Sequence, residues 1–173
     1  RFQAICDNLL FLPEKLTALS EPIYKTPLSF GEVIPDFEMI LSMTTHQPME
    51  GYWVLELWHK PRNELVYLLT FAKLDESLLI SVVQGPNFEG SKEMVKQLTK
   101  TCYGLRPAYL MVETMKALTK ALGFKTLLGI PQKYQNNRMC GLQSFSLPSL
   151  STHCTFSFPP SFNENLYHHT LSK

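Results

Sequence analysis

The chain has 173 residues, of which 45% are hydrophobic and 18% charged, and this composition indicates a folded domain and not a disordered segment. Its formal net charge of +1 gives no electrostatic reason to expect nucleic acid or an anionic membrane as the main partner. No apolar run approaches the roughly 20 residues that a spanning helix needs, so the sequence predicts no transmembrane segment.

Residues 1–20 predict an amphipathic helix, because apolar residues recur there at spacings of three and four as far as Leu19. Pro13 is expected to end or kink this helix, since it lacks an N–H and its ring clashes with the preceding turn. The opening lacks the charged-then-apolar layout of a signal peptide. The next segment is predicted to be an irregular connector because it contains three prolines: Pro22, Pro27 and Pro35.

Between residues 36 and 83 the sequence predicts strands. Short breaks with turn residues separate four apolar runs: FEMILSMTTH, YWVLELWH, ELVYLLTFAKL and SLLISVVQG. In the second run Trp53, Leu55 and Leu57 alternate with a second set that includes Glu56, which is typical of a strand with one partly polar face. Because short breaks favour hairpins, we expect a four-stranded antiparallel meander.

Two helices and a further strand are predicted after the meander. The segment SKEMVKQLTKTCYG has an apolar face, and Ser91 is well placed as its N-cap. In the next segment Pro107 suits a first helical turn and Gly123 a C-cap. This second helix carries an apolar stripe made of four residues: Met111, Met115, Leu118 and Leu122. The short apolar run FKTLLGI then predicts a strand, whose arrival from a helix favours parallel pairing with the meander.

The sequence therefore predicts the α+β class: an antiparallel meander of about four strands, then two helices and a further strand. Residues 1–137 are expected to form a single domain. Residues 138–173 are rich in Ser, Phe and Pro and show no sustained periodicity, so we expect a low-order tail there. The four cysteines are widely spaced, which favours free thiols in a reducing compartment and hence the cytoplasm: Cys6, Cys102, Cys140 and Cys154.

Residues 67–130 carry a resemblance to the VirK/YbjX family, a bacterial domain of unknown function. The shared elements occur in the family's order: Gln84-Gly85-Pro86, Thr99-Lys100, Gly104-Leu105-Arg106-Pro107, and Gly123 followed by TLLGI. The resemblance implies that residues 1–137 are a family domain that is incomplete at its N-terminus. It also implies a cytoplasmic bacterial protein associated with virulence and envelope phenotypes, without a known reaction.

The sequence after Ile130 departs from the family. The family continues with a Ser-Asn and His-containing segment, an Asp-Tyr-Asp-like stretch and a Gly-Gly turn, and none of these is present here. Residues from about 138 onward are therefore expected to differ from the family's C-terminus. A shifted reading frame, a truncated gene and a divergent but functional segment are all compatible with this composition.

The loop from Gln84 to Ser91 is the first candidate ligand site. It leaves a strand and opens a helix, its glycines permit close backbone approach, and free N–H groups at a helix start attract anions. The element order also resembles the core of the Gcn5-related acyltransferases, which implies an acyl-CoA or similar cofactor at this loop. However, their Gln/Arg-x-x-Gly-x-Gly/Ala signature is not in register, and a plain turn that includes Gly85 and Pro86 is the alternative.

Charged residues of the two helices form a second set of candidates. The guanidinium of Arg106 could hold a phosphate or carboxylate. The alternative is structural: Gly104 caps one helix, Pro107 starts the next, and Arg106 makes an ion pair. Lys100 and Glu113 could act as a binding cation and a general base, although single charges on helices are usually only solvated.

The remaining patterns give no specific chemistry. No metal site is predicted, because no close chelating pair is present among the candidates Cys140, His153, Cys154, His168 and His169. No nucleophile elbow, Walker loop or His-Glu-x-x-His helix is present either. The aromatic residues Tyr52, Trp53 and Trp58 could stack on a ligand, but core packing is more common for strand aromatics.

Two hypotheses of function remain from the sequence. The first is an accessory protein of the VirK/YbjX type that acts through protein contacts. The second is an acyltransferase-like enzyme that binds its cofactor at the loop from Gln84 to Ser91.

Overall fold

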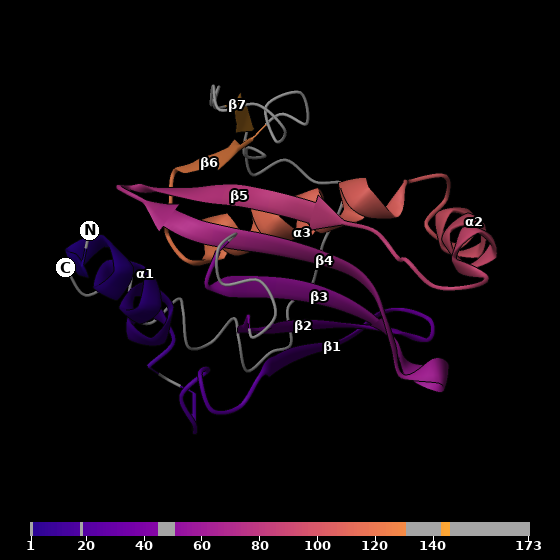
Figure 1. The fold of residues 1–173 in the computed structure, drawn as a ribbon, viewed down its shortest axis with the longest axis horizontal. Coiled ribbons are helices and arrows are strands. Elements are labelled where there is room, and N and C mark those ends of the chain that lie inside the picture. Colours follow the sequence, from indigo (N-terminus) through magenta and orange to yellow (C-terminus); the bar gives the residue numbers. More distant parts are fainter. Residues whose placement is uncertain (1, 18, 45–50, 131–142, 146–173) are drawn as a thin grey trace.

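The computed structural model describes residues 2–17, 19–44, 51–130 and 143–145 of the chain (Figure 1). Its elements follow in the order α1 (Phe2–Lys15), β1 (Leu28–Ile34), β2 (Phe37–Met43), β3 (Trp53–His59), η1 (Lys60–Arg62), β4 (Glu64–Leu74), β5 (Ser77–Gln84), α2 (Ser91–Thr101), α3 (Pro107–Ala121), β6 (Thr126–Gly129) and β7 (Gln143–Phe145). Among these residues seven strands form one mixed sheet in the spatial order β1 to β7, so the predicted α+β class is confirmed.

The predicted meander is present as β2 to β5, and every neighbouring pair is antiparallel. The interpretation of the preceding segment as an irregular connector was wrong, because β1 pairs with β2 there. β1 begins directly after Pro27 and ends directly before Pro35. Proline cannot donate to a strand ladder, so the two prolines bound an edge strand without interrupting it.

The parallel pairing predicted for the last strand is confirmed. β6 pairs with β5 in parallel, with Ser77 opposite Thr126 and Ile80 opposite Gly129. β7 then pairs antiparallel with β6, although the sequence predicted no regular element in that segment. The other residues of 138–173 lie outside the described part of the chain.

One continuous core fills the space between the sheet and the helices. On β3 the alternating residues Trp53, Leu55 and Leu57 are fully buried, which confirms that Trp53 is a core residue. α3 lies across the sheet and contacts β3, β4, β5 and β6. The predicted stripe of α3 is buried, at 0% or 1% exposure for each member: Met111, Met115, Leu118 and Leu122.

α1 is attached to the sheet by Asn8 and Trp53. The Asn8 amide accepts a hydrogen bond from the Lys73 N–H at 2.6 Å and donates one to the Lys73 carbonyl at 3.0 Å. The Trp53 indole N–H donates to the Asn8 carbonyl at 2.8 Å. The Phe11 ring meets the Trp53 ring edge-on, with centroids 6.4 Å apart. α1 is thereby fixed to both β3 and β4.

The expected effect of Pro13 is shifted by two residues. α1 continues through Pro13 to Lys15, and the Leu16 N–H still donates to the Leu12 carbonyl at 3.0 Å. A proline in the last helical turn removes one hydrogen bond near the helix end, where little helix remains to be disrupted. The apolar residues beyond Lys15 therefore enter the core from outside the helix.

We expect Leu118→Asp to abolish cooperative folding, since it places an unpaired carboxylate at a position that is 0% exposed. The expected loss in the free energy of unfolding is about 3 kcal/mol or more. The matched control is Lys120→Asp on the exposed side of the same helix, which should cost about 1 kcal/mol or less. Urea denaturation followed by circular dichroism measures both, and a cooperatively folding Leu118→Asp variant of near-normal stability would contradict the assignment.

Candidate functional site

The turn between α2 and α3 carries the candidate site, and we call it the α2–α3 corner. It comprises five residues: Lys100, Tyr103, Leu105, Arg106 and Tyr109. α2 lies beyond one end of the sheet, and α1 lies at the opposite end of the molecule (Figure 1). The corner therefore belongs to the part of the fold that is farthest from the α1 attachment.

Tyr103 has a left-handed backbone conformation at the end of α2, with a φ of 53°. Its N–H donates to the Lys100 carbonyl at 3.2 Å, and the Gly104 N–H donates to the Thr99 carbonyl at 2.9 Å. This pair of hydrogen bonds satisfies two carbonyls that a helix end leaves open. Gly104 takes part in the cap as predicted, but a tyrosine holds the position that glycine normally fills.

The end of α3 shows the usual solution to the same problem. There the Gly123 N–H donates to the Lys120 carbonyl at 3.0 Å, and the Phe124 N–H donates to the Thr119 carbonyl at 3.1 Å. Gly123 has a φ of 80°, which costs a residue without a Cβ nothing. Any other residue pays about 1 kcal/mol for this conformation, so Tyr103 is strained where Gly123 is not.

No packing offsets this strain, because the Tyr103 side chain is fully exposed. Two more large hydrophobic residues follow within six positions, with Leu105 39% exposed and Tyr109 60% exposed. Tyr109 lies on α3 one turn after Arg106, on the side away from the buried stripe. The corner thus presents three apolar or amphipathic side chains to solvent.

Lys100 and Arg106 add two positive charges to the corner. The predicted ion pair of Arg106 was wrong, because this exposed N-cap residue of α3 pairs with no described residue. Lys100 and Glu113 do not form a functional pair either. The Glu113 carboxylate instead pairs with the Lys116 ammonium at 2.6 Å.

The nearby carboxylate of α2 is also neutralised. The Glu93 carboxylate pairs with the Lys96 ammonium at 2.8 Å on the exposed side of the helix. Because the two closest helical acids already have basic partners, the corner cations keep their charge for another ligand. The charge of the chain is nearly balanced overall, but it is positive here.

The loop from Gln84 to Ser91 lies at the other end of α2. Gly85 lies against the Tyr67 ring, since a Cβ at this position would be 3.3 Å from three of its atoms. Phe88 packs against the core. The N-cap of α2 is Gly90, with a φ of 82° and no side-chain cap, so the prediction of Ser91 was wrong. That Arg106 lies near Gln84, Gly85 and Pro86 stays a prediction.

Burial controls the two shifted groups near these elements. Burial raises the pKa of the Tyr67 hydroxyl and also that of the Cys102 thiol, which lies in the turn that ends α2. A raised pKa keeps both groups protonated at neutral pH. An activated nucleophile needs the opposite shift, so neither residue has the properties of one.

The paired strands β5 and β6 diverge beyond their shared hydrogen bonds. Parallel pairing ends at Ile80 and Gly129, whereas β5 continues to Gln84. A register shift in the β4–β5 pairing falls between Thr70 and Phe71, at the same level of the sheet. β6 then runs away from β5 (Figure 1). The last half of β5 is therefore separated from β6 beside the loop that leads to α2.

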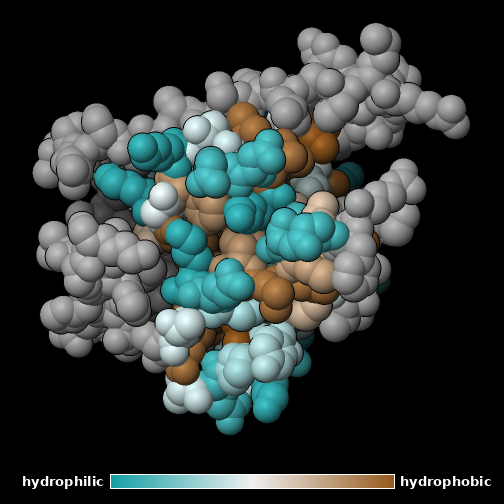
Figure 2. All heavy atoms as spheres, turned by 90° about the vertical axis from the view of Figure 1, so that its left-hand side faces the viewer, coloured by the Kyte–Doolittle hydropathy of each residue, from teal (hydrophilic) through white to brown (hydrophobic). Residues whose placement is uncertain are grey.

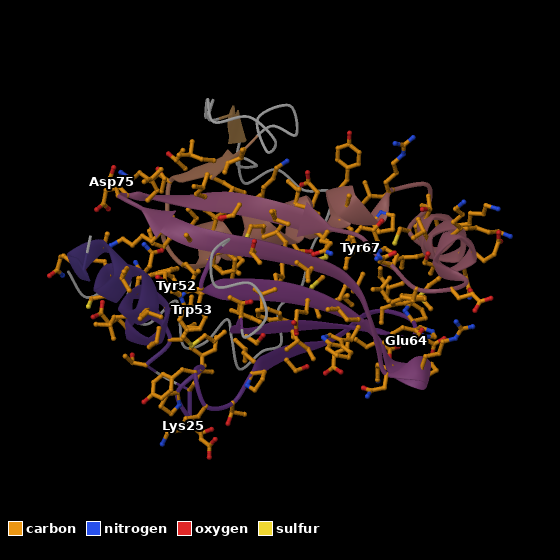
Figure 3. The ribbon with its side chains drawn as sticks, viewed as in Figure 1. Lys25, Tyr52, Trp53, Glu64, Tyr67 and Asp75 are labelled. Carbon is orange, nitrogen blue, oxygen red and sulfur yellow. The ribbon has the colours of Figure 1, made fainter. Side chains whose placement is uncertain are left out.

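His59 and Glu64 were missed by the sequence analysis. They face each other across β3 and β4, and His59 Nδ1 and Glu64 Oε2 are both buried without a hydrogen bond. The Arg62 guanidinium lies 3.9 Å from Glu64 Oε2, too far for a hydrogen bond. Glu64 lies at the η1 end of β4, on the same side of the molecule as α2 (Figure 3). Only their proximity across the hairpin, which depends on the register, makes this pair visible.

Within the described ranges no three His, Cys, Asp or Glu side chains gather as metal ligands. Cys6 and Cys102 are free thiols there. The five candidate ligands considered from the sequence lie outside the described residues. None of the helices in the described part is long and apolar enough to span a bilayer.

These features define a small α+β domain with a mixed sheet, a two-helix crossover and an exposed basic and aromatic corner. The family model for a protein of unknown function, DUF535, matches residues 1–147. The chain therefore belongs to the DUF535 family, which is the VirK/YbjX family. No solved structure matches the chain.

Three curated relatives are similar to most of the chain. An uncharacterized protein of Haemophilus influenzae is 85% identical over 136 residues, which are 79% of this chain and 47% of that protein. A Mannheimia haemolytica protein named membrane protein LapB is 70% identical over 136 residues, 79% of this chain and 60% of its own. A second uncharacterized H. influenzae protein is 32% identical over 138 residues, 78% of this chain and 47% of its own. The chain thus spans about half the length of the relatives it matches.

We expect Gly85→Ala to destabilise the domain by about 1–2 kcal/mol, because its methyl group would press on the Tyr67 ring. Tyr67→Leu removes the opposing ring atoms, so Gly85→Ala should cost clearly less in that background. Denaturant unfolding of the four proteins in this double-mutant cycle measures the coupling. Equal costs in both backgrounds would show that Gly85 does not depend on its contact with Tyr67.

Proposed function

We propose that this domain is an accessory protein of the bacterial envelope that acts by contact and not by catalysis, with the α2–α3 corner as its contact surface. The observation that carries the proposal is Tyr103, an aromatic side chain that is fully exposed and held in a left-handed conformation. Strained residues persist where the surrounding structure and a function require them. Here no internal packing benefits from the side chain, so its benefit lies in an external contact.

The envelope location is supported by a relative and by the thiols. The relative that is 70% identical is named a membrane protein, and this supports an envelope association for the present chain. Cys6 and Cys102 are free thiols, which are typical of a reducing compartment. The proposal therefore puts the domain on the cytoplasmic side of the envelope.

A role without catalysis is supported by the state of the groups near the corner. The Cys102 thiol has a pKa raised by burial, and the Glu113 carboxylate is paired with Lys116. A general base needs an accessible proton acceptor, and a nucleophile needs a lowered pKa or an adjacent base. The exposed tyrosines and cations of the corner are instead the residue types that dominate contact surfaces.

We expect the full chain, expressed with an epitope tag in H. influenzae, to enter the envelope fraction after cell breakage. A triple variant, Tyr103→Ser/Leu105→Ser/Tyr109→Ser, should shift largely to the supernatant because it removes the apolar surface of the corner. The matched control is Tyr24→Ser, which changes a tyrosine that is 56% exposed in the connector before β1. Immunoblots of the fractions give the result, and a wild-type chain in the supernatant would overturn the proposal.

An acyl-CoA site is the second candidate function, favoured by the divergence of β5 and β6. Parallel strands that separate beside a loop and a helix start can admit a thioester arm between them, with its pyrophosphate at the helix N–H groups. Gly85 and Gly90 border this region, and Gly90 leaves the start of α2 without a side-chain cap. Pro86, Lys100 and Arg106 complete the set of candidate ligand residues that the sequence predicted.

Thermal unfolding with acetyl-CoA tests this candidate. A tenfold excess over the dissociation constant stabilises the folded state by about 1.4 kcal/mol. For a chain of this size the midpoint should rise by roughly 3–6 °C. Pantetheine, which lacks the nucleotide and the pyrophosphate, is the matched ligand and should give a much smaller rise. An unchanged midpoint at millimolar acetyl-CoA would exclude the acyl-CoA site.

A further inference from the structure

We propose that the α2–α3 corner binds the headgroup surface of an anionic lipid bilayer, as a peripheral contact that does not cross it. This inference rests on the proposed function, because it names the partner of the same contact surface. Two properties of the corner carry it: the kind of side chain exposed and the sign of the charge around it.

Tyrosine is suited to the boundary between headgroups and acyl chains. Its ring is apolar and its hydroxyl forms hydrogen bonds, so it is enriched at membrane interfaces. Tyr103 and Tyr109 expose their rings on a turn, with Leu105 between them. A fully exposed side chain on a convex turn can enter a deformable lipid surface directly, whereas a protein partner would need a pocket shaped for it.

The backbone strain has a simple role in this arrangement. The left-handed conformation of Tyr103 completes the cap of α2, and it leaves the ring without any contact inside the domain. Glycine would complete the same cap at a lower cost but would expose no ring, as Gly123 does after α3. The strain is therefore the cost of presenting an aromatic ring at the outermost point of the turn.

The charge of the corner selects an anionic surface. Lys100 and Arg106 are exposed and form no ion pair with described residues, while Glu93 and Glu113 are neutralised by lysines of their own helices. Basic side chains beside an apolar insertion point add electrostatic attraction to anionic headgroups. The attraction is local, so it is compatible with a formal net charge of only +1.

The opposite end of the molecule lacks this combination. α1 exposes Ile5 and Leu10, at 42% and 52%. However, Asp7 and Glu14 are also exposed on that helix, and they would repel an anionic surface. Hydrophobic and hydrophilic side chains are mixed on this end of the molecule (Figure 2). α1 therefore provides apolar surface without the matching charge.

Vesicle co-sedimentation tests the inference with the purified full chain. The vesicles are phosphatidylcholine alone and phosphatidylcholine mixed with phosphatidylglycerol. We expect binding to the mixed vesicles, little binding to the neutral ones, and loss of binding at high salt because salt screens the attraction. The triple variant Tyr103→Ser/Leu105→Ser/Tyr109→Ser should bind the mixed vesicles at least tenfold more weakly.

A charge variant and a matched control separate the two contributions. Lys100→Gln/Arg106→Gln should lose about tenfold or more in affinity for the mixed vesicles and lose the preference for anionic lipid. The control Tyr24→Ser/Lys25→Gln removes an exposed tyrosine and a lysine from the connector before β1, where Lys25 lies far from α2 (Figure 3). It should bind like the wild type.

A single substitution covers the case in which the triple variant is poorly folded. Tyr103→Gly keeps the cap of α2 and relieves its strain, so the variant should be folded and yet bind anionic vesicles several-fold more weakly. Wild-type chain that does not bind the mixed vesicles overturns the inference, as does a loss that is equal in the control. If the vesicles fail while the corner still directs the chain to the envelope fraction, the partner is a protein, and the proposed function stands without the lipid.

Discussion

The parallel pairing of β5 with β6 is the constraint on which the rest of the structure depends. Two parallel neighbours cannot be joined by a tight turn, so the chain must leave the end of β5 and return to the level where β6 begins. α3 makes the return across the sheet and buries Met111, Met115 and Leu118 against it. α2 makes the outward path and lies beyond the end of the sheet, with Met94 and Leu98 as its buried residues. A turn between such helices is necessarily far from the core, which explains why the α2–α3 corner is so exposed.

The two helix ends of the crossover show how stability and exposure were separated. Both ends form the same pair of backbone hydrogen bonds, but one uses Gly123 and the other Tyr103. Gly123 is followed by Phe124, which is buried and packs edge-on against Phe11. Tyr103 is followed by Gly104 and Leu105, which lead outward. The first end therefore closes the core, and the second presents side chains to whatever lies outside the domain.

Much of the fold was predictable because local patterns determine it. The meander, the stripe of α3 and the parallel strand follow from periodicity and from the order of elements, and all three are confirmed. β1 was missed because Pro27 and Pro35 were taken to mark a loop, whereas its pairing partner is identified only by the tertiary fold. The cap of α2 was assigned to Ser91 because a serine side chain is the common solution, but the left-handed Gly90 replaces it. The family relationship was also visible in the sequence, because its motifs lie in this same crossover.

The candidate site was only partly predictable, for reasons that differ between its residues. Lys100 and Arg106 were recognised as candidates, but the absence of an ion pair for Arg106 depends on where the acids of neighbouring turns lie. Tyr109 could have been recognised, since it lies opposite the apolar stripe of α3 and is therefore expected to be exposed. Tyr103 could not, because periodicity says nothing of the backbone conformation of a residue between two helices. Net charge was misleading in a similar way: a sum near zero describes the whole chain, whereas binding depends on the few charges within a Debye length of the contact. A nearly neutral domain can therefore present one basic surface, provided that its acids are paired elsewhere, as Glu113 is here.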